Sequence, residues 1–516
     1  MKRLLKQLLV AALLPLSLGG CMSGGLLGTV GPDYTPEAPP VADRWHAATP
    51  SPDAGQPVLP HQGDAADLRR WWDRFDDPVL ARLLDAAQKE SASVSDARAR
   101  IEQSRSDLVG AGVASFPDLA LNISSACAGM SFGCPAQYRK RQLVSVQSNW
   151  ELDLFGGHAR QREATQAQFD SHLAAWHDAR VAVAVEVADA YLGYRYCRIQ
   201  LTLAGADVES LETSARLADI AGRAGLQTPS DVALARASAA ESANTLSKRT
   251  ADCDRAVKGL VALTGLDEAA LRQELDADPA RAARLPAPPA FTLDALPAKV
   301  VQQRPDVNAA ERDVAQASAQ IGVNEAERYP KLSISGSLTA NPIVFGGARG
   351  AAASHWAIGP SLSVPLVDGG RRIADVEAAK AQYAAAVVRY HATVRTAVKE
   401  VEEALVRLAS ANEQLPRARS ALQAYRISFE AANTRHQAGL GSLLDAESAR
   451  RALLSAEASL AELEQERVSA WIALYRAAGG SWPDSAGTPD AATARTQGPA
   501  VAAAPSRISN SEASHD

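Results

Sequence analysis

The chain has 516 residues, a formal net charge of −6 and 5% aromatic residues. The negative charge excludes a generally basic protein that binds nucleic acid through its overall field. Ala, Leu and Arg are abundant, and few Gly or Pro residues interrupt the longest tracts. This composition predicts a mainly helical protein with unusually long helices.

The N-terminus predicts export. Three positive charges in the first six residues precede an apolar run at Leu8–Leu18, which is shorter than the roughly 20 residues that a bilayer requires. We therefore interpret residues 1–20 as a signal peptide. The sequence Leu-Gly-Gly-Cys at 18–21 resembles the lipobox of bacterial lipoproteins, which implies that Cys21 takes up lipid. The same resemblance implies that Met22 after it favours sorting to the outer membrane, and an incidental Cys21 after an ordinary signal peptide is the alternative.

The strongest organising signal is an internal duplication. Four landmarks of the first half return in the same order in the second half, each displaced by 213 or 214 residues. They are Phe116-Pro117 and Tyr329-Pro330, Gly156 and Gly369, Gly225 and Gly439, and Asp231 and Asp445. We therefore predict two tandem copies of one unit, repeat 1 at 78–270 and repeat 2 at 294–482. A lipid-anchored extended segment at 21–77, a linker at 271–293 and a disordered tail at 483–516 complete the predicted organisation.

Each copy contains two short segments in which apolar and polar residues alternate, a pattern typical of strands. The apolar positions are Leu119, Leu121 and Ile123; Val144, Val146, Trp150, Leu152 and Leu154; Leu332, Ile334 and Leu338; and Trp356, Ile358, Leu362, Val364 and Leu366. No stretch after the signal peptide approaches 18 consecutive apolar residues, so we expect these strands to make any membrane crossing. A soluble antiparallel sheet with one buried face is the alternative. At an offset of 213 residues Trp150 would match Ser363 and not Leu362, so the apolar positions of the last segment are shifted by one residue. This shift predicts a bulge near Leu366–Asp368.

The tracts between the strands predict helical hairpins. His158–Gly222 would extend roughly 100 Å as one helix, and the chain turns at Gly225 and again at Gly439. The returning tracts are Thr228–Gly265 and Ser442–Ala478. We expect coiled-coil hairpins, with Pro416 kinking or breaking the second long helix.

Four strands cannot close a barrel, and open sheet edges are not tolerated in lipid. Two chains would give eight strands, whose interior is filled by side chains, whereas three chains would give twelve strands and a lumen. The sequence therefore predicts a mainly α, internally duplicated chain that contributes four strands to a trimeric membrane β-barrel standing on a long helical tube.

Several motifs resemble the TolC-like outer-membrane factors, in particular the NodT-type lipoprotein branch that serves resistance-nodulation-division efflux pumps. They are Gly31-Pro32-Asp33-Tyr34, Trp71-Trp72, Asp77-Pro78, Trp150-Glu151-Leu152-Asp153-Leu154-Phe155-Gly156, Arg304-Pro305-Asp306 and Tyr329-Pro330. The resemblance covers residues 21–482. It implies a homotrimer with a twelve-stranded barrel and a twelve-helix periplasmic tunnel. Substrate would pass from an inner-membrane efflux transporter through a periplasmic adaptor (membrane fusion) protein, without catalysis, cofactor or nucleic acid.

The two helical turns carry the candidate gate. Asp231 and Asp445 follow the turns at equivalent positions, and three chains would place up to six carboxylates around one axis, a ring that binds cations. The resemblance implies that Asp445 lines such a constriction, although a second family aspartate falls on Ser448 here. The alternative role for both aspartates is helix capping.

The adjoining turns resemble the surfaces that meet the adaptor in this family. These adaptor-contact residues are Gly225, Leu226, Gly439 and Leu440. Their alternative role is turn formation, in which Gly supplies a positive φ.

The cysteines suggest disulfides, because the exported chain reaches an oxidising compartment. Cys197 and Cys253 each lie 28 residues from Gly225, so an antiparallel hairpin places them side by side. We predict a disulfide between them, with two separately buried thiols as the alternative. Cys127 and Cys134 lie between the first two strands and are a second possible pair, whose connectivity the sequence does not fix.

No motif for a metal site, a phosphate-binding loop or a nucleophilic serine is present. We therefore expect a channel component and not an enzyme. Two other functions stay open on the sequence: a type I protein-secretion channel, which shares the architecture, and a non-channel periplasmic scaffold lipoprotein.

Overall fold

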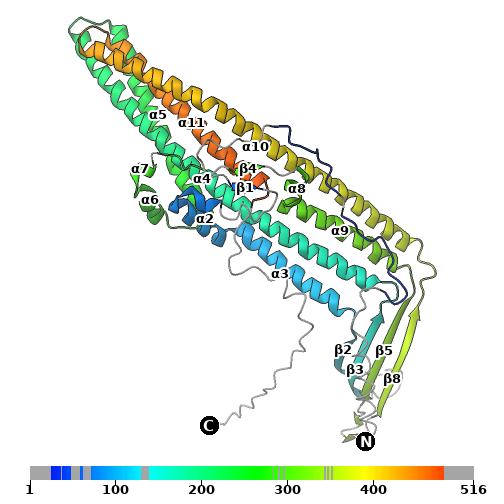
Figure 1. Cartoon of the computed structure of the whole chain (residues 1–516). Helices are drawn as coiled ribbons and strands as arrows, with labels where there is room; N and C mark the ends of the chain where they lie inside the picture. The colour runs from blue at the N-terminus through cyan, green and yellow to red at the C-terminus, as the bar shows by residue number, and fades with distance from the viewer. Residues whose placement is uncertain are drawn as a thin grey trace, which may run out of the picture.

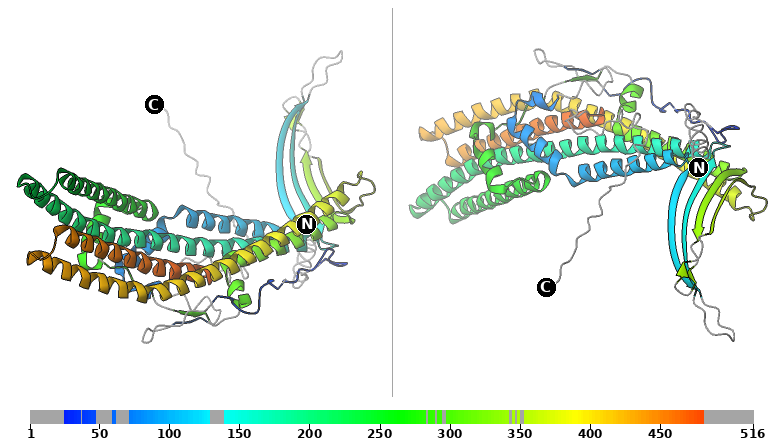
Figure 2. Two further views of the ribbon diagram at one scale, coloured as in Figure 1. Left: turned by 90° about the horizontal axis from the view of Figure 1, so that it is seen from above. Right: turned by 90° about the horizontal axis from the view of Figure 1, so that it is seen from below.

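The computed structural model describes residues 25–36, 38–47, 59–61, 71–128, 139–282, 284–288, 291–293, 297–341, 344–345, 348–349 and 353–480. The molecule is elongated, with a curved sheet at one end and the turns of two long helical hairpins at the other (Figures 1 and 2). Within the described part of the chain, no helix has the length and hydropathy needed to cross a membrane.

Four antiparallel strands form the sheet, in the order β2-β3-β5-β8. They are β2 (Asp118–Ala128), β3 (Arg139–Leu152), β5 (Lys331–Asn341) and β8 (Ala353–Ser363). Each repeat contributes two of them, which confirms the predicted fold class. Two small pairs were not predicted: β1 (Leu59–His61) runs parallel to β4 (Phe291–Leu293), and β6 (Val344–Phe345) pairs with β7 (Ala348–Arg349).

The register corrects the predicted bulge. β8 pairs with β5 without interruption from Ala353 to Ser363, and the strand ends before Leu366. The parity shift arises because the connection from β8 to the next helix, Val364–Gly370, is longer than Asp153–Gly156 after β3. The extra residues lie in this connection and not in the ladder.

Two helical hairpins carry the length of the molecule. Each pairs a 67-residue helix with a shorter one, and the ends of α4, α5 and α11 lie within one residue of the tracts predicted above. They are α4 (Gly157–Arg223) with α5 (Pro229–Thr264), and α10 (Arg371–Gln437) with α11 (Leu443–Ala477). Of the two outcomes predicted at Pro416, a break is wrong, because α10 continues through it, and a kink stays a prediction. Leu408, Ala411 and Leu415 are almost fully buried just before the proline, and this packing offsets the lost hydrogen bond.

Two further helices of 22 residues lie alongside the sheet-proximal parts of α4 and α10 (Figure 1). α3 (Ala92–Val113) packs on α4, and α9 (Pro305–Ala326) packs between α4 and α10. The end of α11 meets the start of α9, where Arg304 donates to the carbonyl of Ala477 (3.2 Å).

The main hydrophobic core lies about midway between the sheet and the hairpin turns. Trp71 is stacked on Tyr475, with ring centroids 4.6 Å apart. Asp77 caps the next helix and accepts hydrogen bonds from Tyr191 (3.0 Å) and Arg195 (2.9 Å) of α4. The short elements here are η3 (Trp72–Phe75), α2 (Pro78–Glu90), α6 (Glu268–Asp276), α7 (Pro279–Ala282) and α8 (Pro297–Gln302).

Residues 25–36 and 38–47, which we call the N-terminal strap, run along the helices from the sheet end (Figure 1). Arg160 of α4 has a side chain that is 5% exposed and donates to Val30 O (3.0 Å), Gly31 O (3.2 Å) and Asp33 Oδ1 (2.7 Å). Gly31 faces Gly322 of α9 so closely that an added Cβ would lie 2.3 Å from the Cα of Gly322. The strap therefore docks on surfaces from both repeats.

Candidate functional site

The turns of the two hairpins have the same backbone structure. Gly225 and Gly439 adopt φ values of 71° and 72°, which favour glycine. The next residue in each turn, Leu226 or Leu440, donates its N–H to a carbonyl five residues earlier at 2.8 Å, as in a Schellman motif. The backbone thus presents one leucine at each turn in an equivalent position.

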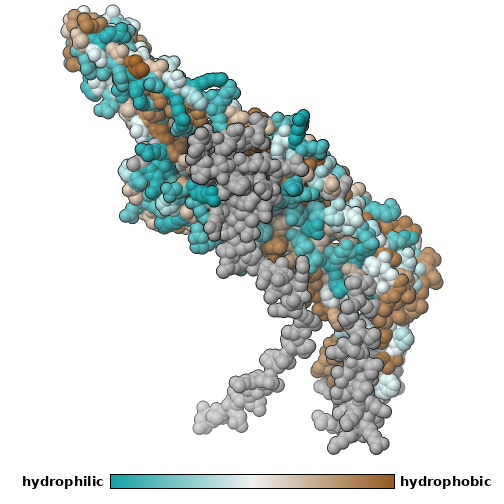
Figure 3. Space-filling view, viewed as in Figure 1, coloured by the Kyte–Doolittle hydropathy of each residue, from teal (hydrophilic) through white to brown (hydrophobic). Residues whose placement is uncertain are grey.

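These leucines are not packed within the chain. Leu226 and Leu440 are each 80% exposed, and the nearby Leu444 is 67% exposed. In a Schellman turn the residue at the position of Leu226 or Leu440 commonly contacts the last helical turn. Because these two leucines are exposed instead, each hairpin end carries an unpacked apolar side chain. Figure 3 shows apolar side chains at the hairpin tips and again at the sheet end.

The two candidate gate aspartates differ in their contacts. Asp231 is part of a reciprocal capping box, because the Thr228 hydroxyl accepts from Asp231 N (3.2 Å) and Asp231 Oδ2 accepts from Thr228 N (3.4 Å) and Thr228 Oγ1 (2.8 Å). Asp445 N donates to Ser442 Oγ (3.1 Å), but among the described residues its carboxylate has no hydrogen-bond or ion-pair partner. Both aspartates are exposed. Asp445 therefore presents the freer charge.

Ser448, where the resemblance places a second aspartate, faces its own helix. Its hydroxyl donates to the carbonyl of Asp445 at 3.1 Å. It supplies no carboxylate to this position.

The structure joins Cys197 of α4 to Cys253 of α5 in a disulfide, with Cα atoms 5.5 Å apart. Both residues are buried. Cys21 and Cys134 lie outside the described residues, and the side chain of Cys127 is not described, so their predicted roles stay predictions.

The hairpins contact each other just above the turns through residues that the sequence analysis did not identify. Ser210 of α4 donates to Glu447 of α11 (3.0 Å), and Arg450 donates to the carbonyl of Ala206 (2.9 Å). The sequence around a polar residue on an exposed helix does not indicate which other helix it will contact, so these two contacts were not predicted.

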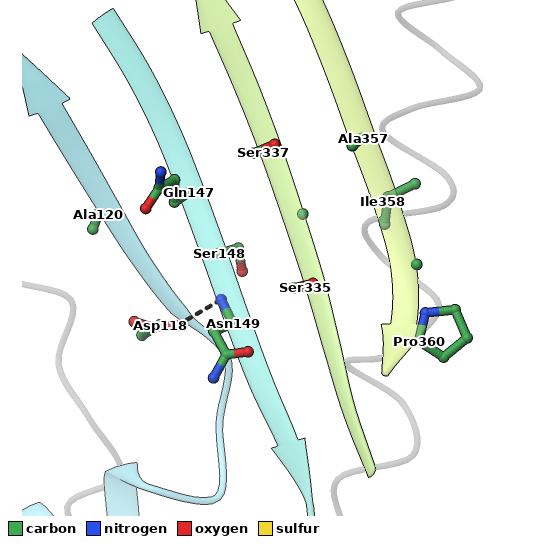
Figure 4. Close-up of a pocket in the computed structure, with 12 residues that line it drawn as sticks. Asp118, Ala120, Gln147, Ser148, Asn149, Ser335, Ser337, Ala357, Ile358 and Pro360 are labelled. Atoms are coloured by element: carbon green, nitrogen blue, oxygen red, sulfur yellow. Dashed lines mark hydrogen bonds between the residues drawn. The ribbon is translucent and has the colours of Figure 1, made fainter. Parts of the chain in front are cut away.

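The sheet separates polar and apolar residues onto opposite faces. One cross-strand row is Leu121, Val146, Leu338 and Trp356, whereas the next is Ala120, Gln147, Ser337 and Ala357. The apolar face is exposed, with Leu121 at 63% and Trp356 at 74%. A recess of about 530 Å³ lies over the sheet, and Asp118, Asn149 and Ser335 are among the residues that line it (Figure 4). Asp118 accepts a hydrogen bond from the Asn149 backbone N–H at 2.7 Å.

A second recess, of about 560 Å³, lies between α4, α10 and α11. It is lined in part by Asp189, which is exposed to solvent. Desolvation in the recess raises the pKa of Asp189 to about 6, against the opposing effect of Arg407 and Arg476. Beside it, burial opposes the charge of Arg304, but hydrogen bonds to Asp306 and Glu400 (2.7 Å each) outweigh it and raise the pKa of Arg304.

Nothing in the described part of the chain suggests a metal centre, because no group of three His, Cys, Asp or Glu side chains is placed to hold an ion. The structure instead defines an open sheet, apolar on one face and polar on the other, that continues into helices long enough to extend well beyond a membrane. This is the architecture of an outer-membrane channel subunit.

Comparisons with known proteins agree. The sequence profile described as outer membrane efflux protein matches twice, at residues 83–266 and 296–480, and the chain belongs to this family. It is 30% identical to nodulation protein T of Rhizobium leguminosarum bv. viciae over 499 residues, which cover 95% of this chain and 98% of that one. It is also 30% identical to outer membrane protein OprJ of Pseudomonas aeruginosa over 493 residues, 92% of this chain and 96% of that one.

Among solved structures, the outer-membrane channel OprN aligns with a TM-score of 0.73 and 28% identity, over 88% of this chain and 99% of that one. The family resemblance, the fold and the outer-membrane location inferred from the sequence are thereby confirmed. The chain is an outer-membrane efflux protein.

Proposed function

We propose that three copies of this chain form one passive channel, which conducts small molecules from an inner-membrane transporter across the periplasm and the outer membrane. The observation that carries this proposal is the four-stranded sheet. Its apolar face is exposed, and each of its edge strands, β2 and β8, pairs on one side among the described strands. An open edge is unstable in lipid, and three sheets of four strands close into a barrel wide enough for a lumen.

Planar bilayer recordings test the channel. Purified protein should give uniform conductance steps, and a cross-linker should trap trimers. Monomers that give no conductance would refute the proposal and favour the scaffold lipoprotein. A pump of the drug-efflux type that co-purifies with the channel distinguishes efflux from type I protein secretion. We expect that purified trimer does not accelerate any chemical conversion of a transported compound. This result would support a channel component and not an enzyme.

The hairpin turns are the proposed contact with a periplasmic adaptor protein. Leu226 and Leu440 are exposed apolar side chains on a turn whose backbone is fixed by glycine. Apolar side chains held at a defined position favour a complementary apolar groove on a partner.

Of the two candidate gate aspartates, we propose that Asp445 contributes more to the gate. Asp231 accepts hydrogen bonds within its capping box, whereas the Asp445 carboxylate is unpaired among the described residues. Three copies of Asp445 around one axis form a ring that attracts cations. Asp445→Asn should therefore weaken cation block of the conductance more than Asp231→Asn does. Equal effects, or no effect of either change, would contradict this proposal.

Cys21 is the proposed lipid anchor. The first described residue, Gly25, lies at the junction of sheet and helices, where Leu26 N donates to Asp153 O (2.8 Å). Four residues extend at most about 14 Å, so lipid on Cys21 would enter the membrane beside the strands. Cys21→Ser should remove acyl chains detected by mass spectrometry. An unchanged protein mass would refute lipidation at this residue.

A further inference from the structure

A third recess, of about 200 Å³, lies where the sheet joins the helices. It is enclosed by the ends of β3 and β5 and by the ends of α4 and α9 nearest the sheet. β3 and β5 are the two central strands of the sheet, and α4 packs on α9. The recess therefore lies within one chain, away from the edge strands that would meet neighbouring copies. Its charged and titratable lining residues are Glu151, Asp153, His158, Glu327 and Lys331.

His158 is the titratable group of this recess that lacks a partner. Its Nε2 atom is buried and has no hydrogen-bond partner among the described residues, and Glu151 Oε1 lies 3.8 Å from it. This distance is too long for a hydrogen bond, but the two side chains form an ion pair when the imidazole is protonated. His158 is also the second residue of α4, where the helix dipole disfavours positive charge. The charge of His158 thus depends on the carboxylates beside it.

One ammonium group serves two carboxylates in the recess. Lys331 Nζ lies 2.6 Å from Glu327 Oε1 and 3.7 Å from Glu151 Oε1. The Asp153 carboxylate accepts a backbone N–H of α4 at 2.9 Å. The recess therefore holds three carboxylates and one ammonium, a net charge of −2 that becomes −1 when His158 is protonated.

The other charged groups near this end of the four elements have their own partners or oppose protonation. Arg160 is bound by Glu163 and by the strap. Arg328 pairs with Glu325 at 2.8 Å. Arg162 lies one turn further along α4, and a cation at this spacing disfavours a second positive charge. The carboxylates of the recess are therefore the charges that favour protonation of the histidine.

We propose that His158 sets the charge of a selectivity collar, which is formed by the five recess residues of each of three chains. Glu151 and Lys331 lie on the polar face of the sheet, opposite Ser333 and Ser363, and this face lines the lumen of the channel proposed above. A ring of negative charge favours cations. Protonation of the three histidines halves the net negative charge of the collar and lowers its preference for cations. The collar rests on the proposed channel, whereas the coupling of His158 to Glu151 does not.

Histidine titration in the full-length, detergent-purified protein tests the coupling. Hydrogen exchange at the Cε1 position of each histidine, followed by mass spectrometry, gives its titration midpoint. Glu151→Gln should lower the midpoint of His158 by at least about 0.5 pH units, because a carboxylate 3.8 Å away is lost. His355, which is exposed on the polar face of β8, is the control and should not shift.

The Glu151 ion pairs are partly exposed and stabilise little, so the variant should fold. Glu151→Ala is the second variant if the Gln protein is poorly folded. An unchanged midpoint of His158 in a folded variant would overturn the coupling.

Reversal potentials in planar bilayers under a KCl gradient test the collar. The cation-to-anion permeability ratio of the wild type should fall at least about twofold from pH 8 to pH 5, the range in which histidine ordinarily changes charge. His158→Gln should lose most of this fall. His158→Lys should give the low ratio at both pH values, because its positive charge is fixed.

His355→Gln is the matched control and should keep the fall. Asp189, which titrates in the same range, is present in every variant and so cancels in the comparison. An equal fall in the wild type and in His158→Gln would overturn the collar. A wild type without conductance would refute the channel and the collar with it, and the titration would still decide the coupling.

Discussion

The two hairpins have the same turn and different supports. Their glycines, exposed leucines and N-capping hydroxyls occupy equivalent positions with nearly equal geometry. The first hairpin adds a disulfide and a reciprocal capping box, whereas the second packs α11 between two helices and leaves Asp445 unpaired within the described residues. Duplication has therefore kept the backbone of the unit, while the side chains around it have diverged.

The largest expected effect tests what the hairpins share. Changing both Leu226 and Leu440 to Asp should abolish adaptor binding, because burial of a leucine contributes about 1.5–3 kcal/mol. The two single changes should weaken binding to a similar degree, since both side chains are equally exposed. Binding of purified adaptor to the trimer measures this, with the double change to Met as the control. Unequal single effects would show that the two turns have separate roles.

The next effect tests where the repeats differ. Arg304 precedes α9, and Ser91 holds the equivalent position before α3, 213 residues earlier. Arg304→Ala removes a buried guanidinium from Asp306 and Glu400, whose side chains are partly exposed, and should cost about 1.5–3 kcal/mol. Ser91→Ala removes an N-cap and should cost about 1 kcal/mol. Denaturant titration of the two variants measures the difference, and similar losses would contradict the divergent role of this position.

A smaller effect concerns the helix caps below the turns. Thr228→Ala removes the two hydrogen bonds of the Thr228 hydroxyl and leaves the backbone half of the capping box, whereas Ser442→Ala removes a single hydrogen bond. Each change should cost about 1 kcal/mol, with the loss at Thr228 the larger. Amide exchange in the first turn of α5 and of α11 reports the two losses separately. A larger loss at Ser442 would reverse the comparison.

The smallest effect concerns pH in the recess between the hairpins. The pKa of Asp189 is about 6 in the folded chain and 3.8 when unperturbed. The folded state therefore retains this proton longer than the unfolded state does, and the resulting stabilisation is lost as pH rises from about 4 to about 6. Asp189→Asn should flatten this part of the stability profile, measured by thermal unfolding between pH 4 and 7. An identical profile in the variant would exclude Asp189 as the cause.

The sequence predicted most of the hairpin architecture because its signals are local. Glycines at the turns and the absence of breakers located the ends of α4, α5 and α11 within one residue, and equal spacing about Gly225 identified the cysteine pair. The difference between Asp231 and Asp445 was not predictable, since Thr228 and Ser442 both begin the same capping pattern. The docking of the strap was missed because Gly31 and Gly322 are nearly three hundred residues apart, and no local pattern reports such a contact.

The N-terminal strap also constrains the order in which the protein folds. Tyr34 donates to Glu311, a contact across 277 positions of the chain, and Gly31 closes against Gly322. Contacts of such separation form late, because the intervening chain must first be brought together. The strap precedes α9 in the sequence by nearly three hundred residues, so its binding surface is complete only after α9 has formed. A segment that lies early in the chain is therefore among the last to reach its final position.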